Sequence, residues 1–498
     1  MDIFLAALGM MFDPLVLALL IAGTIGGIII GALPGLGSIM GITMALPLTF
    51  VLSPEASLGL LLGIYCGSVF GGAISAILIN TPGTPQSAAT LFDGYPMARA
   101  GRAGEAIGWA TVASAAGGVI ATLLFMVAAP TLASFGLMFG PIEYFALGVF
   151  ALTCLAAISR ENVIKGLLAG LLGLFIATVG QDSITGAPRF SFGNYQLYGG
   201  IGLVPILVGL FALSEVFERM SERVEHGAAT IIKSGFRLPT VRDMYARKFA
   251  FLKSSLIGTG IGILPGIGAA AASMVSYAEA KRNSPNRDNF GKGEPDGIIA
   301  SEAANNAVTA GAMIPTLSLG VPGDPITAIM LGAMTIQGVI PGPNFFVNEG
   351  DLGVFVFLAL IVSSLALIPF TALLSPLIAR LIKAPEPLLF GGVVVLVMIG
   401  TFSVSYNYLD LLVAFLSGIV GYVLRRNEIP LAPIVIGFVL GPMVESSLRQ
   451  GMILTEGDFW AFFRSPIASI LFAVTAFSLV MPVWSALRGR GRQDPQRN

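Results

Sequence analysis

Charged residues are scarce in this sequence. Asp, Glu, Lys and Arg make up only 11% of its 498 residues, against about 25% in typical soluble proteins. The chain has a single histidine, His226, and two cysteines, Cys66 and Cys154, which both lie in apolar segments. One histidine cannot supply a His-based catalytic dyad or a multi-histidine metal site in a membrane, and cysteines in apolar surroundings are typical of packed small residues. No Gly-x-x-x-x-Gly-Lys-Ser/Thr motif occurs, and no interleaving of aromatic and basic residues indicates a nucleic-acid partner.

The sequence is rich in long runs of apolar residues. Hydrophobic residues make up 55% of the chain and 62 residues are glycine. Apolar runs recur along it, and about 20 such residues cross a bilayer. This pattern predicts an all-α polytopic membrane protein in the lipid bilayer, and the N-terminus lacks the basic region of a cleaved signal peptide. The runs that we expect to be helices or half-helices cover 15–33, 35–52, 57–80, 86–98, 105–129, 142–159, 163–180, 199–217, 250–264, 266–280, 298–320, 323–341, 352–378, 388–404, 409–423, 431–444 and 466–487.

Two of these runs are followed by the same kind of short motif. Asn80-Thr81-Pro82-Gly83-Thr84-Pro85 and Gly320-Val321-Pro322-Gly323-Asp324-Pro325 both contain Pro-Gly-x-Pro. Such a motif breaks a helix and leaves backbone N–H and C=O groups unpaired, which in hydrocarbon is costly unless these groups line a polar cavity or contact a ligand. Paired breaks at corresponding positions of a duplicated chain are typical of the substrate site of a secondary transporter.

Other motifs recur in the same order and indicate a duplicated chain. Leu33-Pro34-Gly35-Leu36-Gly37 returns as Leu264-Pro265-Gly266-Ile267-Gly268. Pro141 and Glu143 return as Pro385 and Glu386, and Pro205, Gly209 and Glu215 return as Pro433, Gly437 and Glu445. We therefore predict a first transmembrane repeat at 1–217, a cytoplasmic connecting loop at 218–250, a second repeat at 251–450, and an extra C-terminal helix with a basic tail at 451–498.

Charge in the loops predicts how the repeats are oriented. Basic residues cluster in the loop 218–253, at Lys281 and Arg282, and in the tail from Arg488, and such loops are typical of the cytoplasmic side. The loops at Ser53-Pro54-Glu55 and 181–198 carry little positive charge and fit the outside. The first Leu-Pro-Gly hairpin then enters from outside and the second from the cytoplasm, so we predict inverted repeats with broken helices, a periplasmic N-terminus and a cytoplasmic C-terminus.

The most distinctive runs resemble a known family. Residues 67–83, which end in Asn-Thr-Pro-Gly, and Asn305-Asn306 followed by Pro-Thr-Leu-Ser-Leu-Gly at 315–320, resemble the large membrane subunit of the tripartite tricarboxylate transporters, the TctA-like proteins. The resemblance extends from the first Leu-Pro-Gly to about Glu445. It departs at Asp324, where serine is as readily expected in this family.

The resemblance implies a subunit that takes up a small organic anion across a bacterial inner membrane, driven by an ion gradient. It also implies two partners, a small four-helix membrane subunit (TctB-like) and a periplasmic solute-binding protein (TctC-like) that delivers citrate or another carboxylate. A homodimer is compatible with this interpretation. No organic cofactor is expected, and Na⁺ or H⁺ would be the coupling ion.

An anionic substrate needs positive partners, yet the basic residues all lie near loop ends, where their side chains reach the membrane surface. Without basic side chains, the remaining structure that can bind an anion is a helix N-terminus, whose free N–H groups favour carboxylates. We expect helices to restart after Pro85, after Pro325 and after the two Leu-Pro-Gly motifs. The predicted substrate-binding residues are Gly35, Gly37, Ser38, Asn80, Thr81, Gly83, Thr84, Gly266, Gly268, Gly320 and Gly323. The alternative is that these residues only kink helices or allow close packing.

The coupling ion needs oxygen ligands. We predict Asn305, Asn306 and Asp324 as its residues, with Glu302 as a further acid, because amide and carboxylate oxygens bind Na⁺ and either acid can carry a proton. Two alternatives stay open: Asp324 caps the helix that follows it, and Glu302 is a solvated carboxylate near a cytoplasmic loop.

Three functional classes remain to be compared. An ion-coupled carrier explains the duplication, the inversion and the paired breaks together. A channel, or a stand-alone carrier for a different solute, is the alternative, and a channel needs no coupling-ion site. A membrane-embedded enzyme requires an acid or histidine constellation that the sequence lacks, so we predict no enzymatic activity.

Overall fold

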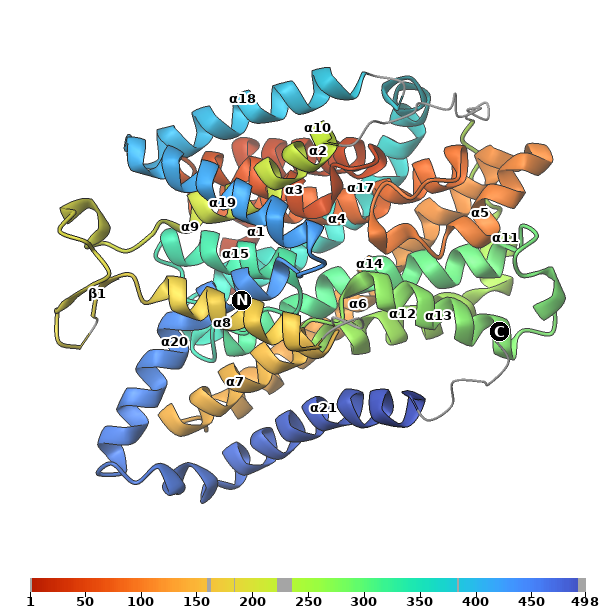
Figure 1. The fold of residues 1–498 in the computed structure, drawn as a ribbon. Coiled ribbons are helices and arrows are strands. Elements are labelled where there is room, and N and C mark those ends of the chain that lie inside the picture. The colour runs from red at the N-terminus through yellow and green to blue at the C-terminus, as the bar shows by residue number, and fades with distance from the viewer. Residues whose placement is uncertain (1, 159–162, 183, 222–234, 383–384, 491–498) are drawn as a thin grey trace, which may run out of the picture. The chain divides into compact units, whose positions relative to one another are not determined.

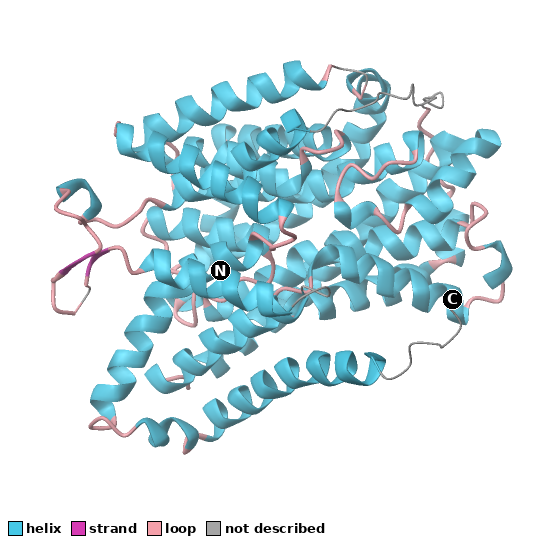
Figure 2. Cartoon of the chain, viewed as in Figure 1, coloured by secondary structure: helices cyan, strands magenta, loops and turns pink. Residues whose placement is uncertain are grey.

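The computed structural model describes residues 2–490 except 159–162, 183, 222–234 and 383–384. Within this part of the chain almost every element is helical, and the sheet found there is a hairpin of two short antiparallel strands, β1 (Gly180–Gln181) and β2 (Pro188–Arg189) (Figure 2). Seven of the described helices are long and apolar enough to cross a bilayer. The predicted class, an all-α polytopic membrane protein, is therefore confirmed.

The chain forms two compact units. Unit 1 comprises Met1–Leu137 and Val204–Tyr422, and unit 2 comprises Met138–Leu203 and Val423–Asn498. Each unit combines segments from both predicted repeats. Part of the predicted connecting loop, 222–234 with His226, and the end of the predicted tail, 491–498, lie outside the described residues.

Unit 1 contains most of the helices (Figure 1). They are α1 (Asp2–Met11), α2 (Pro14–Ala32), α3 (Gly37–Ala45), α4 (Pro54–Ile79), α5 (Leu91–Met97), α6 (Ala103–Gly136), α9 (Leu203–Leu207), α10 (Ser214–Ser221), α11 (Val241–Ala246), α12 (Lys248–Ile263), α13 (Gly268–Asn283), α14 (Pro295–Leu319), α15 (Pro325–Ile336), α16 (Phe345–Asn348), α17 (Gly350–Leu381), α18 (Glu386–Ser405) and α19 (Tyr408–Arg426). Short turns of 3-10 helix lie at Leu46–Phe50, Pro85–Ser87 and Arg287–Asn289, and π-helical turns at Ala98–Arg102 and Val208–Leu213.

Unit 2 is built from α7 (Pro141–Ile158), α8 (Val163–Ala177), the β-hairpin, α20 (Ala432–Leu454) and α21 (Pro466–Arg490), with 3-10 turns at Tyr195–Leu197 and Phe459–Phe463. The predicted extra helix is α21, and it packs against α7.

Glycine brings α2 and α4 into backbone contact. A Cβ atom added to Gly27 would lie 2.6 Å from the carbonyl oxygen of Ile64, and one added to Gly67 would lie 2.3 Å from that of Thr24. Small residues at helix contacts let backbones approach closely in membrane proteins, where dispersion replaces the hydrophobic effect. The two helices lie side by side along their length (Figure 1), so α4 is held at a fixed register before its break.

The final helices of the two predicted repeats make reciprocal contacts. In unit 1 the turn Val208–Leu213 packs on α19, and a Cβ atom on Gly209 would lie 2.4 Å from the carbonyl oxygen of Ala414. In unit 2, α20 packs on α8, and a Cβ atom on Gly437 would lie 2.2 Å from that of Gly170. The last helix of each predicted repeat therefore packs on a helix of the other predicted repeat.

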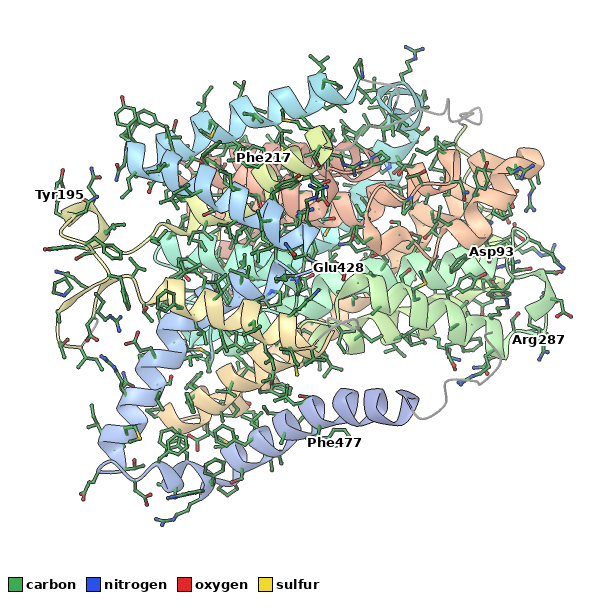
Figure 3. The ribbon with its side chains drawn as sticks, in the orientation of Figure 1. Asp93, Tyr195, Phe217, Arg287, Glu428 and Phe477 are labelled. Carbon is green, nitrogen blue, oxygen red and sulfur yellow. The ribbon has the colours of Figure 1, made fainter. Side chains whose placement is uncertain are left out.

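The hairpin of unit 2 is fixed to α20 by ion pairs. Arg189 donates to Glu445 at 2.6 Å, and Arg449 donates to Asp182 at 2.6 Å. The backbone N–H groups of Thr185 and Ile184, and then Arg449, hold the pKa of Asp182 below its ordinary value. These contacts order a loop whose aromatic side chains remain exposed, among them Phe192, at 90%, and Tyr195, at 76% (Figure 3).

Candidate functional site

The first break ends α4. Asn80 adopts the left-handed conformation with φ of 56°, and the N–H of Gly83 turns back to donate to the carbonyl oxygen of Gly72 at 3.3 Å. Asn80 and Thr81 are exposed, whereas Gly83 and Thr84 are buried. The helix expected to restart after Pro85 begins as the 3-10 turn Pro85–Ser87, and the α-helix α5 begins only at Leu91. The first break therefore offers no α-helix N-terminus.

The second break ends α14 and is followed directly by α15. Gly320 is left-handed with φ of 71°, and its N–H donates back to Pro315 and Thr316. The N–H of Gly323 donates to the hydroxyl of Thr316 at 3.3 Å. In contrast to the first break, residues 321–324 are all buried.

The two Leu-Pro-Gly motifs form sharp hairpin tips. In the first tip, between α2 and α3, Gly35 and Gly37 have φ of 91° and 64°; in the second, between α12 and α13, Gly266 and Gly268 have φ of 88° and 72°. Glycine adopts this backbone region at little cost, whereas other residues rarely do. No side chain at the N-cap position caps α3 or α13. Their first N–H groups are therefore the uncapped helix starts that the sequence predicts.

Each hairpin tip, or the helix that leads into it, contacts the break of its own predicted repeat. A Cβ atom on Gly83 would lie 2.1 Å from the carbonyl oxygen of Gly31, two residues before the tip begins at Leu33. The N–H of Gly266 donates to the carbonyl oxygen of Gly323 at 2.6 Å. The structure thus brings the four predicted motifs together as two pairs, both within unit 1.

A guanidinium group lies on the first tip. The side chain of Arg219, from α10, would be 2.7 Å from a Cβ atom on Gly35, so it covers the backbone there. Arg219 also pairs with Glu215, one turn earlier, at 3.2 Å. In the first turn of α3, Ser38 is 2% exposed and its hydroxyl has no hydrogen-bond partner. A cation, a helix start without a side-chain cap and a hydroxyl without a hydrogen-bond partner therefore lie together at this tip, and sequence reasoning missed the cation.

Asp324 is held as a helix cap. Its Oδ1 accepts from the N–H of Thr327 at 2.7 Å, and the hydroxyl of Thr327 accepts from the N–H of Asp324 at 3.0 Å. Its Oδ2 accepts from the hydroxyl of Tyr65, on α4, at 2.5 Å. The carboxylate occupies the positive end of α15, where negative charge is stabilised. The N-terminus of α15 is therefore already occupied by an anion of the protein itself.

Glu302 is completely buried within α14, so the alternative that it is a solvated carboxylate is wrong. Its Oε1 accepts from the hydroxyl of Thr90, just after the first break, and its Oε2 accepts from that of Ser114, on α6, at 3.0 Å. Asn305, one turn further along α14, donates to the carbonyl oxygen of Val69 at 3.2 Å, while its own Oδ1 has no partner. The carboxylate thus sits among hydroxyl and amide groups from three segments.

The remaining predicted residues have local contacts. Asn306 donates to the carbonyl oxygen of Glu302 in its own helix at 3.4 Å. The hydroxyl of Thr84 lies 3.4 Å from that of Ser87, and the hydroxyl of Thr81 donates to the carbonyl oxygen of Ile79 at 3.4 Å. These contacts do not join the two breaks.

A third buried acid, Asp93 on α5, was not singled out in the sequence. Its Oδ1 accepts three backbone N–H groups, from Gly291, Gly293 and Glu294, at 2.8–2.9 Å, and its Oδ2 accepts from Tyr277 at 2.8 Å. It lies at the same end of unit 1 as the loop that carries Arg287 (Figure 3). Asp93 therefore fixes this loop through both of its carboxylate oxygens.

Comparison with known proteins supplies the family context. The model of the tripartite tricarboxylate transporter TctA family matches residues 17–436. A 52.8 kDa protein from the TAR-I ttuC' 3' region of Agrobacterium vitis is 38% identical over 469 residues, which cover 94% of this chain and 93% of that protein. A protein from the TAR-II ttuC' 3' region of the same organism is 34% identical over 236 residues, which cover 47% of this chain and 98% of that protein. No solved structure matches the chain.

Proposed function

Because the chain belongs to the tripartite tricarboxylate transporter TctA family, we propose that it is the large membrane subunit of an ion-coupled carrier that imports a small organic anion across a bacterial inner membrane. The observation that carries this proposal is the pairing of each hairpin tip with a helix break inside one compact unit. Broken helices beside re-entrant tips hold unpaired backbone groups that a ligand can satisfy, which is the arrangement of secondary transporters.

We place a carboxylate of the substrate at the first tip. The uncapped start of α3, the hydroxyl of Ser38 and the guanidinium of Arg219 are all suited to an anion, since N–H groups and guanidinium donate to carboxylate oxygens. The uncapped start of α13, with Gly266 and Gly268, is the second position. The start of α15 is unsuited, because the carboxylate of Asp324 already lies there and would repel a second anion.

Inverted repeats are part of the proposal, and the reciprocal contacts of the two final helices support it. A cysteine at Val51, whose side chain is 82% exposed, and one at Asp288, whose side chain is 95% exposed, suit impermeant thiol labelling of intact cells. In a background without Cys66 and Cys154, we expect the cysteine at 51 to react from the periplasm and the cysteine at 288 only after the membrane is opened. Reaction of both from the same side would contradict the inverted orientation.

Two partners complete the proposed system, a small four-helix membrane subunit and a periplasmic binding protein. The exposed aromatic residues of the ordered loop in unit 2, such as Phe192 and Tyr195, are a suitable docking surface, since aromatic side chains are enriched at interfaces. We expect uptake at low substrate concentration to need both partners, because the described outer loops are too short to form a capture domain.

Reconstitution tests this dependence. Proteoliposomes with this chain alone, with the small subunit, and with both partners are compared using radiolabelled citrate and then whichever carboxylate the purified binding protein retains. The expected order is little uptake, little uptake and full uptake. High-affinity uptake by this chain alone would leave a stand-alone carrier as the better function.

Two other classes are separated by the same preparation. A channel would equilibrate the substrate without accumulating it, and a membrane-embedded enzyme would convert it chemically. Accumulation of unchanged substrate against its gradient, dependent on an imposed Na⁺ or H⁺ gradient, identifies the proposed carrier.

A further inference from the structure

Among the described residues of unit 1, three carboxylates are at most 4% exposed, and they differ in the groups that stabilise their negative charge. Asp93 accepts three backbone N–H groups, and Asp324 accepts one at the start of α15. Fixed backbone donors of this kind favour the charged form of a carboxylate. Glu302 has side-chain partners alone, the hydroxyl groups of Thr90 and Ser114 and the side chain of Asn305. Among the three, Glu302 is the acid whose charge the backbone does not compensate.

No basic side chain in the described part of the chain pairs with Glu302. Two basic residues of unit 1 pair with other acids: Arg247 pairs with Asp296 at 2.9 Å, and Lys253 pairs with Glu279 at 2.8 Å. A carboxylate that is 0% exposed and has no cationic partner is strongly destabilised in the charged form. The side chain of Glu302 is therefore stable only when a proton or a metal cation neutralises its charge.

The surroundings of Glu302 are rich in oxygen. The hydroxyl of Thr90 lies 3.1 Å from that of Ser301, in the same helix as Glu302, and Ser114 approaches from α6. The Oδ1 atom of Asn305 is buried and has no hydrogen-bond partner. An unsatisfied buried carbonyl oxygen is rare and indicates a missing partner. Hydroxyl groups can rotate to direct lone pairs at a cation, and Na⁺ prefers such a set of carboxylate, amide and hydroxyl oxygens.

We propose that the cation that drives transport binds at Glu302, with Thr90, Ser114 and Asn305 as its neighbours, and that Asp324 is a fixed helix cap without a coupling role. This inference rests on the proposed function, and it selects one of the acids that the sequence left open. The site connects the segment after the first break with α6 and with α14 of the second repeat. Cation binding at Glu302 therefore stabilises one arrangement of segments from both repeats, which is how an ion binding event is coupled to a conformational change.

Thermal unfolding of the purified protein in detergent tests cation binding without any substrate. Wild type, Glu302→Gln and the matched control Asp324→Asn are measured in NaCl and in choline chloride of equal ionic strength, and along a pH series. We expect Tm of the wild type and of Asp324→Asn to depend on Na⁺ or on pH, and we expect Glu302→Gln to lose that dependence. A Na⁺ response identifies a sodium site, and a pH response lost only with Glu302 identifies a proton site. A Glu302→Gln variant that responds like wild type, or a wild type without either response, overturns the proposal.

Uptake separates this inference from the proposed function. In proteoliposomes containing the partners, Glu302→Gln should lose gradient-driven accumulation of the carboxylate, whereas Asp324→Asn should retain it. Ser114→Ala, which keeps the acid, should raise the cation concentration for half-maximal uptake about tenfold, the scale of one hydrogen bond to a charged group. This variant remains informative if Glu302→Gln does not fold.

If wild type accumulates substrate but Glu302→Gln keeps full gradient dependence, the proposed ion site is wrong and the proposed carrier function stands. If wild type does not accumulate substrate, the proposed function fails, and the thermal response still decides the cation site.

Discussion

Replacement of Gly83 by alanine is expected to abolish uptake while the protein still inserts in the membrane. A Cβ atom at this position would lie 2.1 Å from the carbonyl oxygen of Gly31 and 2.6 Å from the hydroxyl oxygen of Ser75. The first of these neighbours is backbone and cannot move aside, so the break must separate from α2. Overpacking of this kind typically costs about 1–3 kcal/mol or more, and here it displaces the tip that the proposed site uses.

The control for this prediction is Gly26→Ala in α2. Gly26 has no atom within 4 Å of an added Cβ, so alanine there removes only the flexibility of glycine and should leave uptake unchanged or stabilise the helix slightly. Uptake and the amount of folded protein are measured for both variants. Normal uptake by Gly83→Ala would show that the first break is not part of the transport machinery.

The second large effect is expected for Arg219→Gln. Its guanidinium covers Gly35 at the first tip, and its removal takes away the positive charge that we assign to a substrate carboxylate. A hydrogen bond to a charged group is worth about 1.5–3 kcal/mol, so KM for the carboxylate should rise roughly tenfold to a hundredfold, with a smaller change in the maximal rate. Arg219→Lys should recover part of the affinity, because lysine keeps the charge but not the two-pronged geometry.

Arg287→Gln serves as the matched control. This residue carries the same charge, but its side chain is 73% exposed in the loop before α14, and its described ion pair, with Asp288, is 4.0 Å long. Exposed pairs contribute little, so KM should not change. Equal effects of the two variants would indicate a general electrostatic effect and not a carboxylate contact at the first tip.

Local sequence patterns predict the helices and their breaks well. The runs 57–80 and 298–320 correspond to α4 (Pro54–Ile79) and α14 (Pro295–Leu319), and both helices end at the predicted motifs. This works because proline and glycine act on the backbone within a few residues. The same reasoning does not predict the helix type after Pro85, where a 3-10 turn precedes the short helix α5, since a proline permits a helix start without fixing its form.

Contacts between distant segments could not be read from the sequence. Tyr65 reaches Asp324, Thr90 reaches Glu302, and Arg219 reaches Gly35. Each of these residues is unremarkable in its own segment, and only the fold brings it to its partner. The one local signal was Glu302 itself, an acid inside an apolar run of small residues.

The ranking of the two candidate acids also needed the structure. Asp324 is conspicuous in the sequence because it follows a Pro-Gly break, but that same position makes it the cap of α15. Glu302 lies two turns inside a helix, where its side chain has no backbone donors and must find partners on neighbouring segments. Helix position therefore distinguishes the acid that caps a helix, Asp324, from the acid that we propose as the cation site, Glu302.

Accumulation of a labelled carboxylate in proteoliposomes is the most direct test of ion-coupled transport by this protein. The chain is reconstituted with the proposed small membrane subunit, the proposed binding protein is added outside, and an inward Na⁺ or H⁺ gradient is imposed. We expect the internal concentration of unchanged substrate to exceed the external concentration transiently and to fall when an ionophore collapses the gradient. Equilibration at the same rate with and without either gradient would contradict a coupled carrier and leave a passive channel as the function.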